Sequence, residues 1–230
     1  MIEPFYTDGK RTIYNGDCLD ILKQFPDKSF DLCLTDPPYG IDLDTDFSVM
    51  VSRPGGYKGK LRGNSYDKIE NDNKFDWNIY WKEIERIGKS FIIFGGDYFI
   101  DRDLFTVGSM SIWDKRLTDS ADKIFGSCFE TIWFYPRQKR DIIRYKWAGL
   151  FGMEKEQQHF RLHPTQKPLD LIKLLINDYA KNPQTILDPF LGSGTTLVAA
   201  KQLNRNAVGI EISEAYCEIA RKRLEQQTLL

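Results

Sequence analysis

The sequence predicts an α/β protein built on a mostly parallel sheet with helices on both faces. Three observations predict this class: short apolar segments alternate with amphipathic ones, the apolar segments have the length of buried strands, and several end in turns containing glycine or proline. A chain of 230 residues is long enough to bury a sizeable core. We therefore expect a single domain, of the size of an enzyme's catalytic domain, spanning residues 1–230.

Residues 12–15, 19–25 and 30–35 form the first predicted strand–helix–strand unit. The segment 30–35 (FDLCLT) is mostly apolar and stops at an Asp-Pro-Pro turn, which is typical of a buried strand. Residues 41–75 are polar, rich in glycine and too long for a routine connection. We expect them to form a mobile loop.

The middle of the chain continues with a helix and a strand. Residues 76–89 have apolar side chains at helical spacing, and the apolar run 90–95 (SFIIFG) ends at a glycine pair. A helix at 98–105 and a strand at 109–113 are expected next. A further strand is expected at 129–135, because this segment is rich in aromatic and β-branched residues.

The remaining third of the chain begins without a regular pattern, between residues 136 and 162, and then becomes strongly periodic. Residues 168–181 (PLDLIKLLINDYAK) predict an amphipathic helix. A strand at 185–187, a helix at 195–203, a strand at 207–210 and a helix at 214–226 complete the predicted elements. Such sheets bind ligands at the carboxyl ends of their strands, so the polar turns there are the first candidates for a site.

Composition excludes several classes of protein. Lys+Arg 32 and Asp+Glu 33 give a net charge of -1 and a pI of about 6.2, which argues against a histone-like nucleic-acid binder. No apolar run approaches the roughly 20 residues of a membrane span, and no signal-peptide layout is present, so a cytoplasmic protein without a membrane partner is expected. The four cysteines form no C-x-x-C pair and there are two histidines, so neither disulfides nor a metal site are expected.

A glycine-containing turn and a later carboxylate indicate a nucleotide-like ligand. Gly192 and Gly194 allow close approach of the backbone, and Thr195-Thr196 opens the next helix with exposed N–H groups. Glu211 ends a strand about 20 residues further on, where a carboxylate suits the two hydroxyls of a ribose. A G-x-G alone is also typical of a tight strand-to-helix turn, and Thr195 in place of lysine disfavours NTP hydrolysis.

Three motifs resemble those of one enzyme family. The segment 188–196 (DPFLGSGTT) resembles the S-adenosylmethionine-binding loop of DNA amino-methyltransferases, and residues 36–40 (DPPYG) resemble their catalytic motif. The segment 163–169 (HPTQKPL) resembles the one that precedes the first helix of their cofactor half. The catalytic motif comes before the cofactor loop, which is the order of the family's β group.

The resemblance implies a Rossmann-like, S-adenosylmethionine-dependent methyltransferase fold with permuted motif order. Its sheet would have seven strands, mostly parallel with one antiparallel strand, and would be rebuilt from the two chain ends, with residues 12–15 beside residues 207–210. Asp17 would then lie near the adenine amino group of the cofactor, Glu211 on its ribose, and Asp188 near its methionine end.

The resemblance and the local chemistry together predict a set of cofactor-binding residues. Its members are Asp17, Asp36, Thr165, Lys167, Asp188, Phe190, Gly192, Gly194, Thr195, Thr196 and Glu211. Lys167 stands out because a lysine at the start of a helix opposes the helix dipole. It is either an exposed lysine of little consequence or, with Thr165, it faces the cofactor's carboxylate or a nearby phosphate.

The expected catalytic residues are Asp36, Pro37, Pro38 and Tyr39. An exocyclic amine of a base is a poor nucleophile because its lone pair is delocalised into the ring, so the catalyst must accept hydrogen bonds from its N–H groups. Asp36 offers a carboxylate, the prolines hold rigid carbonyls, and Tyr39 offers a face for a base flipped out of DNA. A simple strand-ending turn is the alternative.

Two basic clusters are expected to contact DNA. The first lies in the 41–75 loop and the second in 136–162, where the family has its target-recognition segment, here a short one. The predicted DNA-binding residues are Arg53, Lys58, Lys60, Arg62, Arg137, Lys139, Arg140, Arg144 and Lys146. Solvated charge runs without a partner are the alternative.

The sequence therefore predicts a site-specific DNA methyltransferase, a monomer or homodimer, acting on adenine N6. In the family, Asp at the start of the catalytic motif is commoner in N6-adenine enzymes and Ser in N4-cytosine enzymes, and N4-cytosine methylation is the nearest alternative. A nicotinamide-dependent oxidoreductase would explain the glycine turn but leave residues 36–40 without a role. A non-catalytic DNA-binding module is the third alternative.

Overall fold

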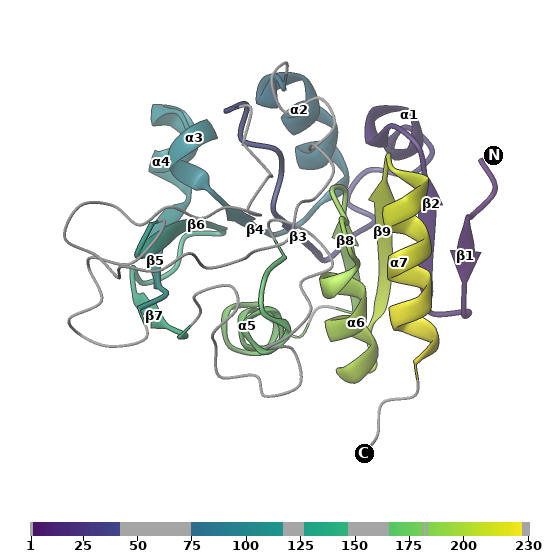
Figure 1. The fold of residues 1–230 in the computed structure, drawn as a ribbon. Coiled ribbons are helices and arrows are strands. Elements are labelled where there is room, and N and C mark those ends of the chain that lie inside the picture. The colour runs from purple at the N-terminus through teal and green to yellow at the C-terminus, as the bar shows by residue number, and fades with distance from the viewer. Residues whose placement is uncertain are drawn as a thin grey trace.

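A computed structural model describes residues 2–41, 75–116, 127–146, 166–180, 182 and 184–226. Within these residues, nine strands form one sheet in the order β1-β2-β9-β8-β3-β4-β6-β5-β7 (Figure 1). The strands are β1 (Tyr6–Thr7), β2 (Arg11–Asn15), β3 (Leu32–Thr35), β4 (Phe91–Phe94), β5 (Ser109–Asp114), β6 (Phe129–Tyr135), β7 (Ile142–Arg144), β8 (Thr185–Asp188) and β9 (Asn206–Glu211).

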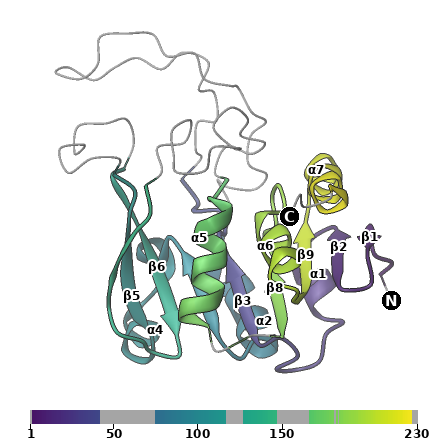
Figure 2. The same ribbon diagram turned by 90° about the horizontal axis from the view of Figure 1, so that it is seen from below.

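Helices cover both faces of this sheet, as the alternation of elements predicts (Figure 2). One face carries α1 (Cys18–Leu22), α2 (Trp77–Ile87), α3 (Gly96–Phe99) and α4 (Arg102–Val107). The other carries α5 (Leu169–Leu174), the π-helical turn η3 (Leu175–Tyr179) that continues it, α6 (Thr195–Gln202) and α7 (Glu214–Glu225). None of the described helices is long and apolar enough to cross a membrane.

The strand directions match the predicted sheet. The strands β2, β9, β8, β3 and β4 are mutually parallel, whereas β6 pairs antiparallel with both β4 and β5. The seven inner strands of the described sheet are therefore the expected ones, with β6 as the antiparallel strand. The total of nine corrects the expected seven, because β1 and β7 add one strand at each edge.

These two edge strands escaped prediction for a simple reason. Strand β1 has two residues and β7 has three, which is too short to display an alternating pattern. Strand β7 lies inside the 136–162 segment, where we expected no regular element, and pairs parallel with β5. Part of the expected target-recognition segment is thus an edge of the sheet.

Strands from the two ends of the chain pair with each other near one side of the sheet. Strand β2 pairs in parallel with β9, with Ile13 opposite Gly209 and Asn15 opposite Glu211. The predicted neighbourhood of residues 12–15 and 207–210 is confirmed. The permuted order of motifs is thus compatible with one continuous sheet.

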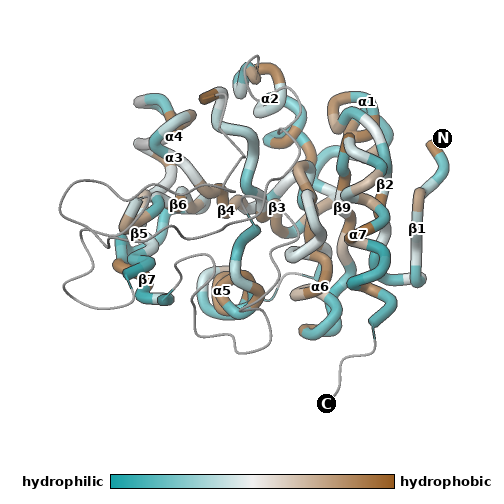
Figure 3. Tube along the Cα trace, viewed as in Figure 1, coloured by the Kyte–Doolittle hydropathy of each residue, from teal (hydrophilic) through white to brown (hydrophobic). Residues whose placement is uncertain are grey.

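Side chains alternate between two hydrophobic cores, one on each face of the sheet. Leu32 and Leu34 pack with α5, α6 and α7, whereas Cys33 between them packs with α1 and α2. The same alternation separates Ile132 from Trp133 in β6. Figure 3 shows the corresponding mixture of hydrophobic and hydrophilic residues along the helices that cover the sheet.

Two predicted helices differ in detail. The helix expected at 98–105 is divided into α3 and α4, because Asp101 caps a new start by accepting a hydrogen bond from the N–H of Leu104 at 2.9 Å. The helix expected at 168–181 begins after Pro168 and widens into η3 over its last turn.

We predict that Leu34→Ala lowers the free energy of unfolding by about 2–5 kcal/mol, because Leu34 is 1 % exposed in the central strand β3. Urea unfolding followed by circular dichroism measures the change. Ile79→Ala, at a position 56 % exposed on α2, is the control and should stay within about 0.5 kcal/mol of the parent protein. Equal losses in the two variants would contradict the assigned core.

Candidate active site

The candidate site lies along the edge where the parallel strands end. Strands β2, β9, β8, β3 and β4 point their carboxyl ends to this edge, and the antiparallel β6 begins there. The turns that follow β2, β3 and β8 contain Asp17, Asp36 and Phe190 respectively, and β9 ends in Glu211. The sheet therefore brings together residues from both halves of the chain.

Asp36 follows the last residue of β3 and has a partner on each of its carboxylate oxygens. The Tyr39 hydroxyl donates to Oδ1 at 2.6 Å, and Nζ of Lys167 donates to Oδ2 at 2.5 Å. The Asp36 side chain is 18 % exposed, so it is largely removed from water. Burial raises its pKa, and the ammonium of Lys167 acts in the opposite direction.

The ring of Tyr39 is held by a second aromatic residue and by a glycine. Tyr98, exposed on α3, stacks on it with ring centroids 4.6 Å apart and an interplanar angle of 11°. A Cβ at Gly95 would lie 2.4 Å from Cε1 of Tyr39, and Gly95 has a φ of +67°. Glycine at 95 is therefore required for Tyr39 to occupy this position.

Lys167 also contacts Glu130, a residue that the sequence analysis did not identify. Nζ of Lys167 lies 3.3 Å from Oε2 of Glu130, whose Oε1 is 2.8 Å from Nζ of Lys115. Lys167 and Lys115 lower the pKa of Glu130 against the effect of burial. A carboxylate in the otherwise apolar and aromatic segment 129–135 was the one signal that could have revealed it.

Asp188, the last residue of β8, is 4 % exposed. Strand β8 pairs with β3, the strand that Asp36 follows. The Thr35 hydroxyl donates to its Oδ1 at 2.8 Å, and the N–H of Phe190 donates to the same atom at 3.2 Å. Burial raises the pKa of Asp188 to about 6, although the hydrogen bond with Thr196 and the one from Thr35 act to lower it. The Thr35–Asp188 bond directly joins the two motif-bearing strands.

Glu211 organises the next part of the edge. Its Oε2 accepts from the N–H of Gly192 at 2.7 Å, and its Oε1 accepts from the N–H of Ser213 at 2.9 Å. The amide of Asn15 donates to the Glu211 carbonyl at 3.0 Å, and the N–H of Gly16 donates to the same oxygen at 3.0 Å. The exposed Asp17, which caps α1, therefore follows directly after residues bound to Glu211.

The glycine-containing loop is fixed by α7. Arg223 donates to the Ser193 carbonyl at 2.6 Å and to the Thr195 hydroxyl at 3.1 Å. A Cβ at Gly194 would lie 2.6 Å from Cβ of Ala220, so close packing of α7 requires glycine at 194. In the sequence, this glycine indicates close approach of a ligand, and no sequence feature points to Arg223.

The two threonines that open the next helix, predicted for their backbone N–H groups, also have buried side chains. Thr195 and Thr196 are 7 % and 4 % exposed, and their hydroxyls bind Arg223 and Asp188 respectively. Both side chains therefore stabilise the loop from within the protein. Thr165 lies outside the described residues.

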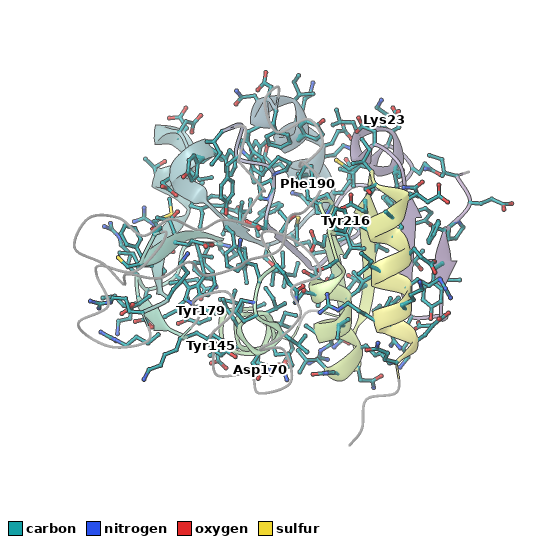
Figure 4. The ribbon with its side chains drawn as sticks, in the orientation of Figure 1. Lys23, Tyr145, Asp170, Tyr179, Phe190 and Tyr216 are labelled. Carbon is teal, nitrogen blue, oxygen red and sulfur yellow. The ribbon has the colours of Figure 1, made fainter. Side chains whose placement is uncertain are left out.

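An aromatic cluster borders the carboxylates. Phe190 meets Phe75 and Tyr80 edge to face, with ring centroids 5.4 Å and 5.5 Å apart. Figure 4 shows Phe190 between α2 and the end of β8. Negative charge on Asp17 contributes to the raised pKa of Tyr80, after burial, which places these rings on the Asp17 side of the edge.

The second basic cluster is divided between two ends of the sheet. Arg144 and Lys146 follow β7 to the edge that carries Asp36, and both are exposed. Arg137, Lys139 and Arg140 come after β6, whose last residue pairs with the first residue of β4, so they lie at the opposite edge. Seven residues of strand separate the edges by roughly 20 Å.

Further details limit what this cluster can do. Arg137 donates to the carbonyls of Gly108 at 3.0 Å and Thr106 at 2.8 Å, which holds the turn after β6 against α4. Tyr145, which the sequence places among the charges, is 8 % exposed and packs in the core. The first basic cluster lies outside the described residues; its members are Arg53, Lys58, Lys60 and Arg62.

In the described part of the chain, no group of His, Cys, Asp and Glu could hold a metal ion.

We predict that the stability of the free protein falls as pH rises through the pKa of Asp188. The folded-state pKa of about 6 exceeds the ordinary value of 3.8, so the folded state binds more protons between these values. Ionisation of the Asp188 side chain should therefore lower the free energy of unfolding by about 3 kcal/mol above pH 6. Asp188→Asn should lack this loss, as measured by urea unfolding between pH 4 and 8.

Asp20→Asn on α1 is the matched control, because its side chain is 73 % exposed. Its stability profile should run parallel to that of the parent protein. If Asp188→Asn also gave a parallel profile, Asp188 would not titrate in this pH range.

The chain is similar to several known proteins. It is 28% identical to the type II methyltransferase M2.DpnII of Streptococcus pneumoniae, over 99% of this chain and 94% of the relative. Its fold is similar to that of the cytosine-N4-specific PvuII DNA methyltransferase, with a TM-score of 0.61, 18% identity, and coverage of 99% of this chain and 91% of the other.

A second solved fold is a DNA modification methylase of Thermus thermophilus in complex with S-adenosyl-L-methionine. The TM-score is 0.54 at 22% identity, and the match covers 93% of each chain. The family model described as DNA methylase, N6_N4_Mtase, matches residues 30–222. That match covers far more than half of the 230 residues and includes both the Asp36 turn and the glycine loop. The chain therefore belongs to the N6/N4 DNA methylase family and is a DNA amino-methyltransferase.

Proposed function

We propose that this protein transfers the methyl group of S-adenosylmethionine to the exocyclic N6 amine of an adenine flipped out of DNA. The observation that carries the proposal is the hydrogen bond between Thr35 and Asp188 at 2.8 Å. It places the Asp36 turn directly beside the glycine loop, so a base amine on one and a methyl donor on the other would be neighbours.

The cofactor site fits S-adenosylmethionine by its chemistry. Carboxylates at the ends of β9 and β8 and after β2, from Glu211, Asp188 and Asp17, match the hydroxyl, ammonium and amino donors of this molecule. The aromatic rings around Phe190 suit its adenine ring. When bound, this cofactor supplies an electrophilic methyl group on a positively charged sulfur.

The Asp36 turn supplies what the target amine needs. Asp36 accepts a hydrogen bond from one N–H and the carbonyl of Pro37 accepts from the other, so the nitrogen lone pair turns out of conjugation with the ring. Transfer of the methyl group to nitrogen leaves one excess proton, which Asp36 is placed to accept. The base would stack on the face of Tyr39 opposite to Tyr98.

Asp at position 36 favours adenine as the target base. Within the family, Asp at this position is commoner in N6-adenine enzymes than in N4-cytosine enzymes. Cytosine N4 remains the second candidate, because the fold neighbour PvuII DNA methyltransferase is cytosine-N4-specific. The two candidates use the same acceptor groups and differ in the ring that carries the amine.

We predict that the protein incorporates methyl groups into unmodified DNA and that Asp36→Ala lowers turnover at least about a hundredfold while S-adenosylmethionine still binds. Radiolabelled methyl transfer and nucleoside analysis measure rate and product, and calorimetry measures cofactor binding. Asp20→Ala is the surface control. N6-methyladenine as the product supports the proposal. N4-methylcytosine as the product would show that cytosine, and not adenine, is the target base. Retained turnover in Asp36→Ala would exclude a catalytic role for Asp36.

DNA should approach the edge that carries Asp36. Arg144 and Lys146 are the exposed basic residues of the second cluster at this edge, whereas Lys139 and Arg140 lie at the opposite one. Contacts to phosphates release counterions, so each contact adds about 0.9 to the slope of log affinity against log salt. The two pairs of residues should therefore differ in their effect.

We predict that the double substitution Arg144→Gln and Lys146→Gln weakens DNA binding and lowers the salt slope by roughly 2. Lys139→Gln with Arg140→Gln removes the same charge from the other edge and serves as the matched control, with an unchanged slope. Fluorescence anisotropy with a DNA duplex between 50 and 200 mM salt, a range of about fourfold, measures both variants. A larger effect in the control would place DNA at the opposite edge.

A further inference from the structure

A row of four charged side chains leads from the edge of the sheet to the catalytic turn. Lys115, Glu130, Lys167 and Asp36 alternate in sign, and the N···O distances between successive members are 2.8, 3.3 and 2.5 Å. Their side chains are only 10–24 % exposed. The row contains two positive and two negative charges and is therefore neutral as a whole.

The fold explains how this row is assembled. Strand β6 is antiparallel, so its second residue, Glu130, lies where the parallel strands end. Lys115 follows the end of β5, opposite the start of β6. Lys167 directly precedes the Pro168 cap of α5, and its Nζ lies 5.0 Å from the ring centroid of Phe94.

A buried lysine at this position needs a reason. The start of a helix disfavours a positive charge, and removal from water disfavours it further. Two carboxylates offset both effects for Lys167, and they raise its pKa although burial alone would lower it. The ammonium is therefore bound to the acceptor of the methyl-transfer site.

The charge state of Asp36 depends on these neighbours. Among the residues that the structure describes, the charged and titratable groups that face it are Lys167, Glu130, Tyr39 and Asp188. Burial and the charge of Glu130 favour the protonated carboxyl, whereas Lys167 and the Tyr39 hydroxyl favour the carboxylate. A protonated Asp36 would lose its ability to take up the proton released on methylation.

We propose that Lys167 is a positioning residue for methyl transfer, held between Glu130 and Asp36 so that its ammonium orients and charge-balances the Asp36 carboxylate. The inference rests on the proposed function and deepens it, because it assigns Lys167 to the target amine's side of the site. The contact of Lys167 with the cofactor, one of the two alternatives that the sequence leaves open, stays a prediction. In the structure, Nζ donates to Asp36 at 2.5 Å.

Steady-state kinetics of the full-length protein between pH 6 and 9.5 separate the two assignments. Lys167→Met should lower kcat roughly tenfold at pH 6.5 and move the acid limb of the pH profile to higher pH. The KM for S-adenosylmethionine should stay within about twofold. Lys167→Arg keeps the positive charge and should bring the acid limb back towards that of the parent protein. A raised KM with an unchanged pH profile would overturn the proposal and favour a cofactor contact.

A direct titration of Asp36 tests the same inference without turnover. In protein labelled with ¹³C at the aspartate carboxyls, the resonance missing from Asp36→Asn belongs to Asp36. Its midpoint should move to higher pH in Lys167→Met and to lower pH in Glu130→Gln, since these variants remove opposite charges. A merely structural role would not produce shifts of opposite sign.

The two measurements also keep the inference separate from the proposed function. If the parent protein transferred no methyl group to DNA, the proposed function would fail, and the titration would still decide the role of Lys167. If Lys167→Met did not fold, Glu130→Gln alone would decide it. A midpoint in Glu130→Gln that is unchanged or higher than in the parent protein would overturn the inference.

Discussion

Parallel pairing between strands from the two parts of the chain, β2 with β9 and β3 with β8, holds the site together. With the pairings of β8 with β9 and of β3 with β4, it aligns the carboxyl ends of five strands at one edge. Asp17 then lies next to Glu211, although 194 positions separate them in the sequence. Without the pairing of β3 with β8, the catalytic turn and the glycine loop would not be neighbours.

The antiparallel strand β6 has a second, local consequence. In a purely parallel sheet, each strand would present the first residues to the far edge, away from the ligand. Reversal of β6 brings Glu130 to the site, where it meets Lys167 and Lys115. Burying single charges costs several kcal/mol each, so the alternating row lets these charges be buried close to Asp36.

Much of the site is held in place by contacts within the protein. Arg223 and Ala220 of α7 hold the glycine loop. The N–H groups of Gly192 and Ser213 orient the Glu211 carboxylate. Tyr98 and Gly95 determine the position of the Tyr39 ring. Such preorganisation reduces the cost of ordering these groups when ligands bind. One glycine of the predicted cofactor loop, Gly194, is also required for the close packing of α7.

The fold class, the seven inner strands and the positions of the Asp36, Asp188 and Glu211 carboxylates at the strand ends could be predicted from the sequence, because apolar periodicity and turn residues are local properties. The partners of these groups became apparent only in the folded chain. Glu130 lies 37 positions from Lys167, and the Arg137 and Lys146 ends of one basic cluster lie at opposite edges of the sheet. Strand direction and the choice of neighbouring strands set such distances, and both depend on contacts between segments that are far apart along the chain.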